Sequence, residues 1–329
     1  MKKGIIFLIT IIVIFSLIIL GISNIKPKEA NNEKIKIVAT LFPQYDFAKQ
    51  IGGDKVDVTL LLTPGTETHT YEPTPQDIIN VNKSDLFIYT GAYMEPWSDK
   101  IASGIDSNTI ILDCSKNINL ISLEQHSEEH DNHEKHDDEQ NDNHEKIESE
   151  SHNHEYDPHI WLNPENAIGM VNNITDELCN IDPQNSAYYK ANAKNYIEQI
   201  NLLDADIQNT IKQSEKNKIA FGGTFAYMYF VKKYNLEYVS AYQSCGEDTE
   251  PSAANVKKVI DYMKQNDIPV IFYQEQSSGK IADTIASETG AIKLVLHTVH
   301  NASQEEIDRG ETYISLMRKN LENLKIALS

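Results

Sequence analysis

The sequence predicts an α/β protein of two similar lobes, each a mainly parallel sheet with flanking helices, joined by one long rigid helix. Two observations support this fold class. From residue 35 onward, short β-branched segments alternate with segments of helical pattern, which is typical of a parallel sheet covered by helices. One helical segment, 183–214, would span about 48 Å, which is longer than one small domain and suits a connection between two.

The first half of the chain carries this alternation up to residue 112. Thr74 and Pro75 form a strong helix start, since a threonine N-cap is followed by proline at the first helical position. We expect strands at 35–40, 56–62, 85–90 and 109–112, and helices at 43–51, 75–82 and 95–105.

The second half repeats the pattern after a break. Almost nothing in 124–155 is apolar, so this segment cannot bury enough surface to fold alone. We expect strands at 218–221, 237–241, 269–274 and 292–296, and helices at 163–180, 224–234, 253–266, 279–289 and 304–328. The predicted organisation is an N-terminal lobe (35–123 plus 156–182), a disordered acid- and His-rich loop (124–155), a linker helix (183–215) and a C-terminal lobe (216–329).

The N-terminus predicts export. Lys2 and Lys3 precede an uncharged run at 4–22, and 19 helical residues would span about 28 Å, close to the thickness of a bilayer's hydrocarbon core. Residues 23–28, directly after the run, contain no good small-x-small cleavage site and no cysteine for lipidation. We expect residues 1–34 to be an uncleaved membrane anchor, or else a signal peptide, and the remainder to lie on the extracytoplasmic face of the membrane.

Charge and cysteine content exclude several classes of protein. The formal net charge is −20, whereas nucleic-acid binding needs a basic face. Much of the acid is local: 124–157 holds 14 Asp or Glu against two Lys. The three cysteines lie far apart with no CxxC pair, which argues against a disulfide framework or a cysteine zinc ribbon. For Cys114 and Cys179 we expect buried, small apolar residues.

Histidines are concentrated in the acidic segment. Seven of the eleven in the chain lie there, and imidazole with carboxylate is a favoured ligand set for zinc, copper and nickel. A solvated acidic linker is the alternative, but it does not explain the histidines. We expect interchangeable, low-affinity metal capture by His126, His130, His133, His136, His144, His152 and His154.

The other four histidines occupy loops at the ends of predicted elements. His69 follows a predicted strand, His159 lies where order returns after the acidic segment, and His297 and His300 follow the predicted strand 292–296. Open α/β sheets bind ligands at the carboxyl ends of their strands. A cleft between the lobes could bring the four together, and three or four such ligands complete a zinc site.

Several blocks of this chain resemble the metal-specific solute-binding proteins of ABC importers, cluster A-I, which take up zinc or manganese. The resemblance covers roughly 35–328 and rests on "LFPQYDFAKQIGGDKV", "LLTPGTETHTYEPTPQDI", "GAYMEPW", "DPHIWLNPENA" and "YISLMRKNLENL". The His-rich insert between the second and fourth of these blocks resembles the mobile loop of the zinc-preferring members. The long helix resembles the family's inter-lobe linker.

The resemblance implies that His69 and His159 are the metal ligands of the first lobe. In the second lobe the family carries a His or Glu where this chain has Thr224, a poor zinc ligand. The family's last ligand is an acid after the final strand, and here His300 or His297 stands in that segment. We favour His300 for that ligand and keep His297 as a substitute for the missing third one. Reserve candidates are Cys245, Glu250 and Thr224 itself.

The function implied by the resemblance is capture of Zn²⁺, with Mn²⁺ second, and its delivery to an ABC permease. The permease and its ATPase would be separate partners, because this chain has no GxxxxGK[ST] loop. Histidine ligands favour zinc, since manganese prefers oxygen. We expect a monomer with no enzymatic activity of its own.

Two alternatives belong to other classes of protein. One is a metal-sequestering surface adhesin without transport. The other is a secreted zinc hydrolase, which would need an open coordination position and a general base such as Glu72. No HExxH motif is present to support the hydrolase.

Overall fold

The structure is a computed structural model that describes residues 33–66, 68–69, 71–105, 108–123, 156–242 and 251–329. The chain divides into two units, Met1–Lys34 and Ile35–Ser329. The expected anchor or signal segment lies almost wholly outside the described residues, as does the acid- and His-rich loop. Within the described ranges, no helix is both long enough and apolar enough to cross a membrane.

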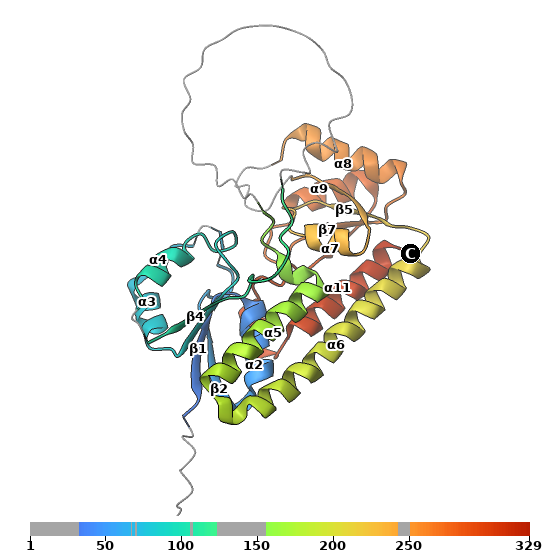
Figure 1. Cartoon of the computed structure of the whole chain (residues 1–329). Coiled ribbons are helices and arrows are strands. Elements are labelled where there is room, and N and C mark those ends of the chain that lie inside the picture. Colours follow the sequence, from blue (N-terminus) through green and yellow to red (C-terminus); the bar gives the residue numbers. More distant parts are fainter. Residues whose placement is uncertain (1–32, 67, 70, 106–107, 124–155, 243–250) are drawn as a thin grey trace, which may run out of the picture. The chain divides into compact units, whose positions relative to one another are not determined.

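The first sheet is fully parallel. Its strands are β1 (Ile35–Ala39), β2 (Val56–Leu60), β3 (Leu86–Tyr89) and β4 (Ile110–Asp113), in the order β2-β1-β3-β4. Leu86, the first residue of β3, is fully buried, and so are the next two, because helices cover the sheet. Figure 1 shows this sheet beside α3 and α4.

Among the described residues, four α-helices precede the linker helix. Thr74 caps α3 through a reciprocal bond with Asp77, which fixes where that helix starts after the His69 loop. Asn163 caps α5 in the same region as His159. The bounds are α2 (Phe42–Gly52), α3 (Pro75–Asn82), α4 (Ser98–Ser103) and α5 (Pro164–Ile181).

The second sheet repeats the plan of the first. Its strands are β5 (Lys218–Phe221), β6 (Glu237–Ser240), β7 (Val270–Tyr273) and β8 (Ile292–Val295), again all parallel and in the order β6-β5-β7-β8. The two parallel sheets have the same strand order, and helices connect their strands. This confirms the predicted fold class.

Two expected helices of the second half are wrong in extent. The predicted helix 304–328 is two helices, because Gly310 adopts a left-handed φ of 73° and Thr312 caps a new start. The predicted helix at 224–234 begins only at Met228, since the backbone before it runs on from β5 as a loop. The observed helices are α7 (Met228–Lys233), α8 (Ala253–Gln265), α9 (Lys280–Thr289), α10 (Gln304–Asp308) and α11 (Tyr313–Ala327).

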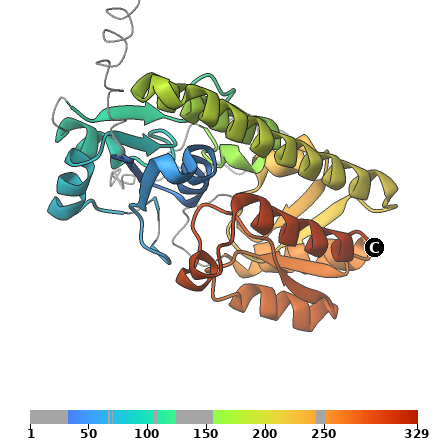
Figure 2. The ribbon, with the colours of Figure 1, turned by 90° about the horizontal axis from the view of Figure 1, so that it is seen from below.

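One helix, α6 (Ser186–Gln213), connects the two halves of the chain. It has 28 residues and follows a single 3-10 turn at Pro183–Asn185. It packs on α2, α5 and α11, and Figure 2 shows it running along both sheets.

Asp46 joins three of these helices. This buried carboxylate on α2 accepts hydrogen bonds from the hydroxyl of Tyr196 on α6 (2.6 Å) and from the backbone N–H of Tyr313 at the start of α11 (2.9 Å). Burial raises the pKa of Asp46, and the hydrogen bonds from Tyr196, Gln50 and Tyr313 oppose that rise. The residue ties the first lobe to the linker helix and to the last helix of the second.

Glu95 fills the topological switch point of the first sheet, between the ends of β1 and β3. Its carboxyl group is fully buried and bonds to the hydroxyl of Thr40 and the backbone N–H of Thr90 (2.9 Å). Burial raises the pKa of Glu95 to about 8, and nearby Asp113 adds to the rise. The position where open α/β sheets bind ligands is therefore filled here by a carboxyl group of the protein itself.

Because the pKa of Glu95 is higher in the folded chain than the 4.5 of the free group, folding favours its protonated form. The stability from this group is fully present below about pH 4.5 and is lost as pH rises through about 8. We predict that the free energy of unfolding of Glu95→Gln exceeds that of the wild type by about 2–4 kcal/mol at pH 9, so the variant unfolds at a higher temperature there, and that the two unfold nearly together at pH 5.

Thermal unfolding followed by circular dichroism from pH 5 to 9 measures this difference. Glu198→Gln, on an exposed position of α6, is the matched control and keeps the wild-type pH dependence. Parallel curves for Glu95→Gln and the wild type would show that Glu95 is ionised in the fold.

Candidate metal-binding site

His69 lies in the loop between β2 and α3 and is 8% exposed. The loop is anchored on both sides of it. The indole N–H of Trp97 donates to the carbonyl of Thr68 (2.8 Å), and the ring of Tyr71 packs edge-on against the same indole at 5.0 Å. The Tyr71 hydroxyl donates to Asp77 on α3 (2.6 Å). These contacts fix the backbone that carries the His69 ring.

His159 lies just before the 3-10 turn Ile160–Leu162 and is 1% exposed. Its ring is 6.0 Å from the ring of His69, centroid to centroid. Its Nδ1 is 3.1 Å from Oδ1 of Asp157, which also accepts the His159 backbone N–H (2.9 Å). A carboxylate can only accept, so the neutral imidazole carries its proton on Nδ1 and its lone pair on Nε2. The structure thus brings the two first-lobe histidines together and orients one of them as a metal ligand would be.

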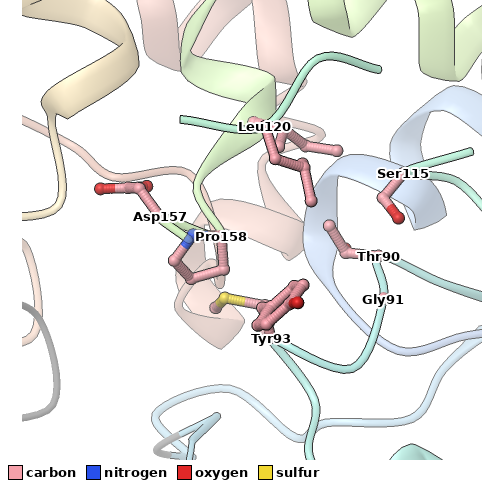
Figure 3. A pocket seen from close by; sticks show the side chains of 9 residues that line it. Thr90, Gly91, Tyr93, Ser115, Leu120, Asp157 and Pro158 are labelled. Atoms are coloured by element: carbon pink, nitrogen blue, oxygen red, sulfur yellow. The ribbon is translucent and has the colours of Figure 1, made fainter. Parts of the chain in front are cut away.

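A small cavity lies behind Asp157. Its volume of about 10 Å³ is the room needed by one water molecule. Figure 3 shows Asp157 and Pro158 on one side of it and Thr90, Gly91 and Ser115 on the other, with the Asp157 carboxylate turned away from the cavity. The carboxylate therefore bonds His159 and does not point into the cavity.

His297 is held within the second lobe. Its Nδ1 accepts the backbone N–H of Val299 (2.9 Å), and its Nε2 is 3.5 Å from Oε1 of Glu306 on α10. The interaction with His297 is the main reason that the pKa of Glu306 falls to about 2. Asn320 on α11 bonds both the N–H and the carbonyl of His297. Both ring nitrogens of His297 therefore face groups of its own lobe.

Val299 turns the chain between the two second-lobe histidines. Its φ is 62°, and a β-branched residue rarely adopts this left-handed conformation. The side chain is fully buried, and its N–H is the donor to His297. Such strain persists only where the surroundings enforce it, and it is common at functional sites.

His300 and His297 both approach Glu275, which follows β7. The distances from Glu275 Oε1 to the Nδ1 atoms are 3.8 Å for His300 and 3.5 Å for His297. Thr298 lies between them: its N–H and its hydroxyl donate to the two oxygens of Glu275 (2.9 and 2.6 Å). The Thr298 hydroxyl also bonds Nδ1 of His300.

The segment 298–301, which carries His300, is hydrogen-bonded to the first lobe at three points. The indole N–H of Trp161 donates to the carbonyl of Thr298 (2.7 Å), and the N–H of Phe42 donates to the carbonyl of His300 (3.1 Å). The amide of Asn301 donates to the carbonyls of Thr63 and Thr66 (both 3.3 Å). Two of these partners are neighbours of His159 and His69 in sequence, so the backbones of all three histidine segments meet where the lobes join.

Thr224 lies at the switch point of the second sheet, where the resemblance places a ligand. Its hydroxyl donates to Oε1 of Gln274 (2.7 Å), whose amide N–H returns to the Thr224 carbonyl (3.0 Å). A polar cavity of about 240 Å³ opens beside this pair, lined also by Glu275, Lys280 and His300. Unlike the first switch point, this one is hollow.

Several expected site residues lie outside the part of the chain that the structure describes. They are Cys245, Glu250 and the seven histidines from His126 to His154. Within the described part, no three His, Cys, Asp or Glu side chains are grouped closely enough to hold a metal ion. Cys114 is buried and Cys179 is half-buried, each as a free thiol.

The sequence analysis missed Asp157, Glu275 and Thr298. Asp157 stands two residues before His159, a spacing that allows a carboxylate to reach the same ring. Glu275 follows a strand at its carboxyl end, which is the criterion that selected His297. Thr298 gave no signal, because its role depends on where the 292–295 strand places it.

Comparison with known proteins identifies the family. The model of the family described as "ZnuA: Zinc-uptake complex component A periplasmic" matches residues 37–327. The high-affinity zinc uptake system protein ZnuA of Bacillus subtilis (strain 168) is 40% identical over 301 residues, covering 91% of this chain and 89% of its own. The zinc-binding protein AdcA of Streptococcus pyogenes is 33% identical, and the match spans 56% of its length.

Solved structures agree with the sequence comparison. The metal-dependent lipoprotein YcdH of Bacillus subtilis superimposes with a TM-score of 0.73 at 36% identity, over 90% of this chain and 99% of that one. The Zn(II)-bound ZnuA-like domain of Streptococcus pneumoniae AdcA gives 0.72 at 29% identity, over the same shares. With a family match over nearly the whole described chain and a relative at 40% identity, the chain belongs to the zinc-uptake complex component A family.

Proposed function

We propose that the protein binds Zn²⁺ between its two lobes, outside the cytoplasm, and delivers the ion to an ABC permease. The observation that carries this proposal is the meeting of the His69, His159 and His300 segments at the junction of the lobes, through the hydrogen bonds of 298–301. The names of the relatives, a zinc uptake protein and zinc-binding proteins, agree with it.

In this proposal His69 and His159 form the first-lobe half of the site and His300 supplies the second-lobe half. The His159 ring offers Nε2, because Asp157 holds the proton on Nδ1. His297 is the alternative second-lobe ligand, and its use would require its ring to leave Val299 and Glu306. The Thr224 hydroxyl is hydrogen-bonded to Gln274. The fourth coordination position is therefore left to another ligand of the cleft or to water.

Imidazole-rich coordination favours zinc over manganese, which prefers oxygen ligands. The acidic segment carries a net charge of −12 over 124–157, from 14 acids and two lysines, and attracts cations to the protein. Its histidines would capture the ion weakly, and the inter-lobe site would hold it tightly. The role is binding and delivery, with no chemical conversion of the ion.

The uncharged run at 4–22 would hold the chain at the outer face of the membrane or direct its export. The permease and its ATPase would be separate chains, and this protein would meet them as a monomer. The loaded protein would dock on the permease and release the ion into it.

Zinc titration tests the site. We predict that removing residues 124–155 keeps one tight site per chain, because the inter-lobe ligands remain. In that shortened protein, His69→Ala, His159→Ala and His300→Ala should each weaken affinity by a factor of roughly 100, since each removes one ligand of the ion. Competition with a chromophoric chelator measures the affinity.

The control is His126→Ala in the full-length chain, compared with the unsubstituted full-length chain; it should leave the tight site unchanged because that histidine belongs to the acidic segment. The inter-lobe site would be wrong if the deletion abolished tight binding while the three substitutions changed nothing.

Delivery is tested in cells. We predict that a strain lacking this protein accumulates zinc more slowly from zinc-poor medium, and that the wild-type gene restores the rate. The His69→Ala gene should restore little of it, whereas the His126→Ala gene should restore most of it. Uptake of radioactive zinc gives the rates. If the His69→Ala gene restored the full rate, with both proteins at equal abundance, zinc import would not depend on this site.

A further inference from the structure

We infer that Glu275, acting through the hydroxyl of Thr298, fixes the tautomer of His300 so that Nε2 keeps its lone pair for the metal ion. Glu275 and Thr298 are positioning residues for the proposed zinc site, so the inference rests on the proposed function. It assigns a role to a buried acid that the proposed ligand set does not use.

The direction of the hydrogen bonds follows from the two bonds that Thr298 makes to Glu275. The Thr298 N–H donates to Oε2 (2.9 Å) and the Thr298 hydroxyl donates to Oε1 (2.6 Å). A carboxylate has no proton to give, so the single hydroxyl proton of Thr298 is committed to Glu275.

His300 Nδ1 bonds the same hydroxyl oxygen. The proton on that oxygen already makes the hydrogen bond to Glu275, so the oxygen can only accept a hydrogen bond from the ring. Nδ1 therefore carries the imidazole proton, and Nε2 carries the lone pair. Nδ1 is also 3.8 Å from Glu275 Oε1, so the negative charge of the carboxylate favours a proton there.

Burial makes this arrangement persistent. Thr298 is fully buried, and the side chains of Glu275 and His300 are 8% and 14% exposed. Glu275 and His300 both line the polar cavity at the second switch point, while the Thr298 backbone is held by Trp161 of the first lobe. The three groups therefore form a fixed chain of donors behind a cavity large enough for an ion and water.

The arrangement matches that of His159 in the first lobe, where Asp157 accepts the hydrogen bond from Nδ1–H directly. Metal-ligating histidines usually donate their second ring N–H to a carboxylate, a backbone carbonyl or water, and the loss of such a partner costs about 10–100-fold in metal affinity. Here the second lobe uses a hydroxyl between the carboxylate and the ring.

Glu275→Gln is the sharpest test, because it has the same shape and reverses the chain of donors. The new amide must turn its oxygen to the Thr298 N–H, so its NH₂ donates to the Thr298 hydroxyl. The hydroxyl then donates to Nδ1 of His300, and the ring proton moves to Nε2. We predict this reversal in the metal-free full-length protein, together with zinc affinity about 10–100-fold weaker.

Nitrogen-15 NMR of histidine-labelled protein at pH 8 reads the tautomer from the ring shifts, and the His300 signals are those that vanish in His300→Ala. Thr298→Val should also release the tautomer, and Thr298→Ser should restore both tautomer and affinity. Glu311→Gln is the matched control: its carboxylate likewise accepts a hydroxyl bond, from Ser315 (2.6 Å), and it should change neither readout.

An unchanged His300 tautomer in both Glu275→Gln and Thr298→Val overturns the inference, even if His300→Ala weakens zinc binding. If His300→Ala itself leaves the tight site intact, the proposed ligand set fails instead. Thermal unfolding of the metal-free variants identifies any that are misfolded, and the Thr298→Ser rescue then decides between a positioning role and a structural one.

Discussion

The hydrogen bonds that dock 298–301 onto the first lobe are the constraint on which the site depends. Each lobe has its own sheet and places histidines in its own loops, and among the described residues no three His, Cys, Asp or Glu side chains are grouped closely enough to hold a metal ion. The bonds from Trp161 and Asn301 bring the His300 segment to those of His159 and His69. The left-handed Val299 allows this docking, because it turns the chain between a histidine bound within its lobe and one that reaches the junction.

The switch points of the two sheets differ in what fills them. In the first, Glu95 fills the space with a buried carboxyl group that bonds the ends of two strands and whose pKa is raised by burial. In the second, Thr224 and Gln274 bond each other and leave a polar cavity bordered by Glu275. Asp46 joins α2 to α6 and to α11, so hydrogen bonds among these helices also link the two lobes. The two sheets therefore share one topology, but one switch point is filled by a side chain and the other borders a cavity.

Most of the fold could be predicted from local signals. Residues 218–221 form the expected strand, and Thr74 caps a helix at the expected Pro75, because β-branched runs and caps act within a few residues. The break at Gly310 was missed because the apolar pattern continues across it. The histidine loops were found by residue type and position, whereas the roles of Asp157, Glu275 and Thr298 depend on which strands lie side by side. Tertiary contacts of that kind leave no periodic trace in one sequence.

The central claim is that one zinc ion is held by histidines of both lobes. Crystals grown with zinc, measured at its absorption edge, locate the ion by anomalous scattering without reference to any assumed ligand. The account predicts a single strong peak about 2.1 Å from ring nitrogens of His69, His159 and His300. A peak bound by residues of only one lobe, or only by the 124–155 segment, would contradict it.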